Sequence, residues 1–123
     1  MADRGVVWAP GMDLMLRSRV GALAEARGYR LQDTPTPPPG TRIALIPFAE
    51  VGRRECGAVP VLAYGHHTDR MGQVAARVAG ARWIVAHRTL GESLAQALDD
   101  LAAQAGSPGP DPVSANPGRK EPM

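Results

Sequence analysis

The sequence has little cysteine and few aromatic residues. Its 123 residues include one cysteine, and aromatic residues make up 4%. A single cysteine excludes an internal disulfide and fits a reducing cytoplasm, which is the location we predict. With so few aromatics, the core has to be built mainly from aliphatic side chains. The apolar stretch Val6–Ala9 near the N-terminus is too short for a secretion signal or a membrane span.

The sequence also lacks several signatures of binding and catalysis. Lys and Arg number 14 and Asp and Glu 12, and no block of like charge is longer than Arg53-Arg54, so we expect no nucleic-acid partner. The Gly-x-Gly-x-x-Gly fingerprint of dinucleotide sites is absent, as are a nucleophile elbow and a carboxylate pair spaced for hydrolysis. We therefore expect no enzyme, no cofactor and no metal. Neighbouring arginines could lower the pKa of Cys56, but a single cysteine without a paired base is more often incidental.

The composition divides the chain into a folded part and a tail. Residues 106–123 are rich in Gly, Pro and Ser and have almost no large apolar side chains, so we predict a disordered tail after a domain of residues 1–105. The proline-rich piece 33–40 is expected to be an extended connection.

Five short apolar runs predict strands, and three segments have the spacing of helices. The runs are Val6–Ala9, Tyr29–Gln32, Ile43–Phe48, Val59–Tyr64 and Trp83–Ala86. Two of them are continuously apolar, which is typical of parallel strands covered on both faces. The residues expected to face the core are Leu16, Val20, Leu23 and Ala24 in the first helix, Met71, Val74, Ala75 and Val78 in the second, and Leu90, Leu94, Ala97, Leu98 and Leu101 in the third.

The alternation of these elements predicts an α/β fold with a three-layer, open parallel sheet. Five strands favour the flavodoxin-like order 2-1-3-4-5. The connections 33–42 and Ala49–Ala58 are too thin to hold full helices, so one sheet face has a reduced helix set. We expect that face to be under-covered and to be a site for a partner.

Polar residues follow three of the predicted strands. In an open α/β sheet the carboxyl ends of the strands are where ligands bind. The histidine pair could contact a ligand, or belong to a solvated loop that caps a helix; the residues after the last strand could bind an anion or cap the third helix. The ligand or partner candidates are Asp13, His66, His67, Asp69, His87 and Arg88.

Over about Val6 to Leu101 the sequence resembles the receiver domain of two-component response regulators. The segments that resemble its strands include Val6–Ala9, Arg42–Ile46 and Trp83–Ala86. Ala75–Ala81, with its Ala-Gly-Ala end, looks like the end of the family's fourth helix, and Val59–Tyr64 looks like a fourth strand that begins near a proline.

The sequence departs from this family at each position that carries its chemistry. The phosphate-accepting Asp is replaced by Pro47, and the acidic pair for Mg²⁺ by Pro10 and Gly11. The Ser or Thr position is Gly65, and the Lys position is His87. Since Mg²⁺ needs oxygen ligands and an acyl phosphate needs a carboxylate, the resemblance implies a degenerate pseudo-receiver.

The sequence therefore predicts a non-catalytic, receiver-like signalling or adaptor domain that works independently of phosphorylation. Its partner would be a protein, including a signalling protein or a second copy in a homodimer, with no role for a membrane. It would dock through the thinly covered sheet face or through the side of the fourth and fifth helices, where the resemblance implies that the family dimerises. The alternative is a small flavodoxin-like ligand-binding protein or enzyme with a site near the His66-His67 loop.

Overall fold

The structure, a computed structural model, describes residues 4–106 and contains a sheet of five strands. The strands are β1 (Gly5–Trp8), β2 (Tyr29–Gln32), β3 (Thr41–Pro47), β4 (Val61–Gly65) and β5 (Trp83–Ala86). All pairings are parallel and the order is β2-β1-β3-β4-β5, as the sequence predicted. All five strands therefore end at the same edge, which is called the carboxyl edge below.

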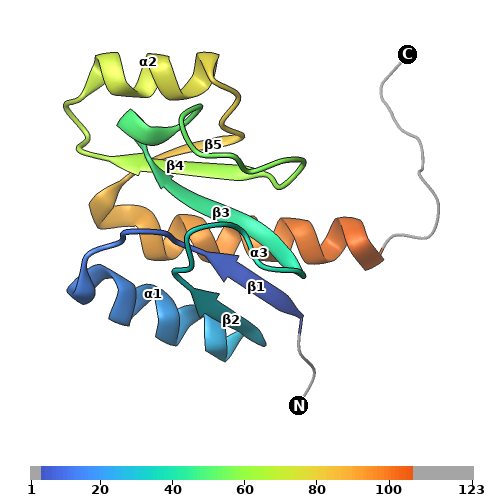
Figure 1. The fold of residues 1–123 in the computed structure, drawn as a ribbon. Helices are drawn as coiled ribbons and strands as arrows, with labels where there is room; N and C mark the ends of the chain where they lie inside the picture. The colour runs from blue at the N-terminus through green and yellow to red at the C-terminus, as the bar shows by residue number, and fades with distance from the viewer. Residues whose placement is uncertain (1–3, 107–123) are drawn as a thin grey trace, which may run out of the picture.

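Three helices cover the sheet in the flavodoxin-like arrangement. They are α1 (Leu14–Ala26), α2 (Arg70–Val78) and α3 (Leu90–Gly106). Figure 1 shows α1 and α3 on one face of the sheet and α2 alone on the other. The predicted reduced helix set on one face is thus confirmed. The predicted tail beyond residue 106 lies outside the described residues.

The larger core lies between the sheet and the α1–α3 pair. Alternate strand residues point into it, and the first and third helices meet it with the apolar residues that the sequence pattern indicated. Its fully or nearly fully buried members include Val7, Leu16, Val20, Ile43, Leu45, Leu62, Leu90, Leu94 and Leu98.

The opposite face is covered by irregular chain as well as by α2. Trp8, Ala44 and Ile46 are 0% exposed there, beneath the β3–β4 connection that supplies Val51 and Val59. The expectation of an open apolar sheet surface is therefore wrong. The short connections form no full helix, but their own apolar side chains pack on these strands and bury them.

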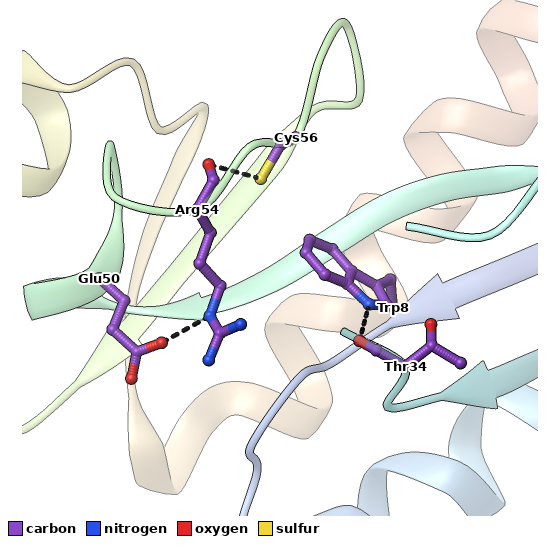
Figure 2. A network of polar contacts seen from close by, with 5 residues as sticks. All are labelled: Trp8, Thr34, Glu50, Arg54 and Cys56. Carbon is purple, nitrogen blue, oxygen red and sulfur yellow. Dashed lines mark hydrogen bonds and ion pairs between the residues drawn. The ribbon is translucent and has the colours of Figure 1, made fainter. Parts of the chain in front are cut away.

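Trp8 ties a second connection to this face. Its indole Nε1 donates a hydrogen bond to the carbonyl oxygen of Thr34, 2.8 Å away, in the proline-rich segment between β2 and β3 (Figure 2). Because proline has no backbone N–H, such a segment makes few main-chain bonds of its own. This side-chain bond helps hold it across the end of β1.

The outward face of α2 is the clearest difference from the sequence prediction. Met71, Val74 and Val78 were expected in the core, but they are 85%, 62% and 83% exposed, and Ala75 is exposed too. Ala76 is the buried residue of the helix. The face beneath is already filled by Phe48 and Ala63 with Ala76, so only a small side chain fits between α2 and the sheet.

Among residues 4–106 no helix is long and apolar enough to cross a membrane.

Candidate functional site

The loops at the carboxyl edge hold most of the predicted candidates. After β1, the side chain of Asp13 accepts hydrogen bonds from the backbone N–H groups of Met15 and Leu16, at 3.0 and 3.2 Å. This is an N-cap, which satisfies donors that the first turn of α1 would otherwise leave without a partner. The carboxylate of Asp13 is therefore engaged in holding α1.

The end of β3 offers no nucleophile. Pro47 is its last residue and leads into a 3-10 turn, η1 (Phe48–Glu50). Phe48 is buried and its ring packs directly on Gly65, at the end of β4, so that a Cβ on Gly65 would collide with the ring. Hydrophobic packing thus occupies the space where a hydroxyl-bearing side chain would have to stand.

An ion pair that the sequence analysis missed lies at this edge. Arg54 Nε and Glu50 Oε1 are 2.6 Å apart, as Figure 2 shows. A Cβ on Gly11 would lie 3.8 Å from Nη2 of Arg54, so the guanidinium reaches the loop after β1. The spacing of four residues between a Glu and an Arg is the signal that could have indicated this pair.

Tyr64 lies in the core beneath this edge. Burial raises its pKa to about 12, repulsion from Glu50 and Asp13 adds to the shift, and Arg54 opposes it. At neutral pH the phenol is therefore uncharged. Its ring centroid is 5.4 Å from that of His87, which links the ends of β4 and β5.

Three of the six predicted candidates lie together. Asp13, His87 and Arg88 line a shallow cavity of about 380 Å³ that Met15, Leu16 and Arg19 also line. His87 and Arg88 belong to a 3-10 turn, η2 (His87–Thr89), that leads into α3. The cavity is open to solvent. Its acidic residue, Asp13, caps α1, so the lining has no carboxylate that is free to bind a ligand.

The other three candidates form the start of α2. The rings of His66 and His67 stack with centroids 5.0 Å apart, and Nδ1 of His66 lies 2.8 Å from Oγ1 of Thr68. Asp69 caps the helix by accepting from the backbone N–H of Gly72 at 2.9 Å. This geometry matches the solvated capping loop that the sequence analysis held open beside a ligand site.

The carboxyl edge does not fit the Mg²⁺ ion that the family resemblance implies. Pro10, Gly11 and Pro47 supply no side-chain oxygen, Asp13 caps α1, and Glu50 is paired with an arginine. Across residues 4–106 no three His, Cys, Asp or Glu side chains are grouped so that they could hold a metal. A divalent ion needs several oxygen ligands, which this edge does not offer.

Cys56, in the β3–β4 connection, is not an activated thiol. It is half-buried, and its Sγ lies 3.6 Å from the carbonyl oxygen of Arg54 (Figure 2). Burial raises the pKa of Cys56, Glu55 raises it further, and Arg54 only partly opposes them. The nearby arginines do not lower this pKa, because burial outweighs their positive charge, and the thiol fits the incidental cysteine of the sequence analysis.

The remaining candidate is a surface, the outer face of α2. Met71, Val74 and Val78 form an exposed apolar stripe, called the α2 stripe below. Arg70 and Arg77 stand beside it on the same helix, and neither makes an ion pair within the described residues. An exposed apolar cluster with a charged border is typical of an interaction site.

Comparison with known proteins supports the fold. No protein-family model and no curated protein matches the sequence. Among solved structures, a provisionally assigned response regulator from Chloroflexus aurantiacus is 12% identical with a TM-score of 0.63, and the alignment covers 80% of this chain and 98% of that one. The ChxR receiver domain from Chlamydia trachomatis is 14% identical with a TM-score of 0.60, covering 81% and 97%.

A response regulator from Burkholderia multivorans is 15% identical with a TM-score of 0.52, and the alignment covers 87% of this chain and 98% of that one. At these identities the similarity is one of fold. The chain thus has the flavodoxin-like fold of response-regulator receiver domains, as the resemblance in its sequence implied.

Proposed function

We propose that this chain is a non-catalytic, receiver-like signalling or adaptor domain that docks another protein, independently of phosphorylation. The observation that carries the proposal is the α2 stripe. Burying its three large apolar side chains against a partner would remove surface worth several kcal/mol from water, at about 25 cal/mol per Å². The cytoplasm remains the predicted location.

Independence from phosphorylation is supported by the packing at the carboxyl edge. An acyl phosphate needs a carboxylate nucleophile, and Pro47 has none. The ring of Phe48 fills the space beside Gly65, and Arg54 already neutralises Glu50. With the acceptor missing and its surroundings filled, phosphorylation has no residue at this position through which to change the docking face.

The alternative, a small ligand-binding protein or enzyme at the His66-His67 loop, has less support. Both imidazoles are exposed. Thr68 contacts His66 and Asp69 caps α2, so the polar groups beside the imidazoles already have partners at the start of this helix.

A photo-reactive residue placed at Val74 in the full chain tests the docking function. The matched control carries the same group at Gln96, an exposed position on α3. We expect a covalent adduct with a protein partner at 74 and none at 96, and we expect the purified partner to bind the wild type but not Val78→Glu. Adducts only at 96 would refute the proposed face.

Phosphorylation is tested with the same purified pair. Acetyl phosphate with Mg²⁺ should add no mass to the chain and leave the affinity for the partner unchanged. A phosphorylated chain, or an affinity that changes by about tenfold or more, would contradict independence from phosphorylation.

A further inference from the structure

We infer that the α2 stripe binds an acidic amphipathic helix of a different protein, and not a second copy of this chain. This inference rests on the docking function proposed above and adds the chemistry of the occupant. It is carried by the size of the stripe, by the charges around it, and by the surfaces that a second copy has available.

The α2 stripe has the shape of a helix-binding surface. Its residues are separated by three and four positions, so they project from one side of α2, opposite the buried Ala76. Nine residues at a rise of 1.5 Å make a strip about 14 Å long. A stable dimer needs roughly 800 Å² from each partner, and a strip one helix wide offers a few hundred at most. A partner helix with anchors at matching spacing fits this size.

The charged side chains of α2 itself are both positive, while the β3–β4 connection near the end of the helix carries Glu55 and the Glu50–Arg54 pair. Arg70 and Arg77 are seven positions apart and therefore lie on the same edge of it. The helix itself has no acidic residue, and the carboxylate of Asp69 is engaged by the N–H of Gly72. An occupant with carboxylates along one flank would complement this edge.

A second copy does not supply such an occupant. Two α2 stripes packed against each other about a two-fold axis would bring Arg70 of one copy towards Arg77 of the other, with no carboxylate between them. Among the described residues, the other exposed large apolar side chains are Leu14 and Met15. They lie at the start of α1, whose Arg17 is paired with Asp33 and which also carries Arg19 and Glu25.

The acidic helix α3 of a second copy cannot bind the α2 stripe in this way either. It carries Glu92, Asp99 and Asp100, but its large apolar residues, Leu94 among them, are buried against the sheet. Thus α3 presents its carboxylates without exposed large apolar side chains beside them. Since the described residues supply no such helix, we assign the occupant to another protein.

Two designed peptides test the inference directly. Each is about 18 residues long so that it forms a helix, and each has leucines at the spacing of the stripe. One carries glutamates along the flanks and the other lysines. We expect the glutamate peptide to bind the full chain at least about tenfold more tightly, with the largest amide chemical-shift changes in residues 70–78 and weaker binding at high salt.

Charge reversal supplies the matched control. Arg70→Glu with Arg77→Glu should reverse the preference of the chain towards the lysine peptide. Arg4→Glu with Arg19→Glu makes the same change in net charge away from the stripe and should leave the preference intact. Circular dichroism checks that both variants fold.

Other occupants give distinct results. A concentration-dependent dimer that Val78→Glu abolishes would identify a second copy and overturn the inference. Tighter binding to phosphatidylserine vesicles than to the glutamate peptide would identify a membrane surface and also overturn it. In contrast, the absence of a photo-crosslinked partner at position 74 would overturn the docking function itself, whichever peptide the chain binds.

Discussion

The orientation of α2 can be tested by comparing a polar substitution on each of its two faces. Val78 is 83% exposed, so Val78→Gln removes little buried surface. Full burial of a valine side chain is worth about 1.5–3 kcal/mol, and less than a fifth of this residue is covered, which leaves a loss of about 0.5 kcal/mol at most. Replacing a β-branched residue with Gln also favours the helix slightly. We expect the free energy of unfolding to change by less than about 0.5 kcal/mol.

The matched substitution on the inner face should behave differently. Ala76 is 0% exposed and packs with Phe48 and Ala63. Ala76→Gln inserts a larger side chain into this contact, which costs about 1–3 kcal/mol, and its amide loses contact with water. A total loss of at least about 2 kcal/mol is expected. Ala76→Val is a milder variant that keeps the comparison measurable should the glutamine variant fail to fold.

Urea unfolding followed by circular dichroism measures both changes. A chain of this size is expected to unfold in one cooperative step, and equal slopes with denaturant make the midpoints comparable. Repeating the measurement at several protein concentrations excludes a contribution from self-association. A large loss for Val78→Gln together with a negligible one for Ala76→Gln would refute the orientation, and with it the docking face.

Three further predictions concern the carboxyl edge and the connections that pack on the sheet. Gly65→Ser should lower the melting temperature, because its Cβ would meet the ring of Phe48; an unchanged melting temperature would contradict that packing. Trp8→Phe should lower the free energy of unfolding by about 2 kcal/mol, since it removes the hydrogen bond to the Thr34 carbonyl and leaves part of a buried site empty. Faster amide exchange in the proline-rich segment would locate the effect there. The pKa of Tyr64 is raised to about 12 in the folded chain, above the ordinary value of 10.0, so the unfolded chain loses its phenolic proton first and stability should fall as pH rises from about 10 to about 12; absorbance titration of a single-tyrosine variant that gave the ordinary value would refute this.

Much of the fold follows from local features of the sequence. Continuously apolar runs such as Ile43–Ile46 can only be satisfied with cover on both faces, and their alternation with helical segments specifies a parallel sheet. The cap at Asp13 and the stop at Gly28 lie at the ends of α1 because their conformations and hydrogen bonds are local. The lack of a carboxylate at Pro47, the last residue of β3, is equally direct, because proline has none in any conformation.

The tertiary structure alone decided which way the apolar side of α2 points and what stands at the carboxyl edge. A period of 3.6 residues determines that Met71, Val74 and Val78 share a side, and it is satisfied equally whether that side faces the core or the solvent. The orientation of α2 depends on Phe48 and Ala63, which belong to other elements and fill the space beneath the helix. Contacts between residues distant in sequence leave no local pattern, and so the most exposed apolar surface of this domain became visible only in three dimensions.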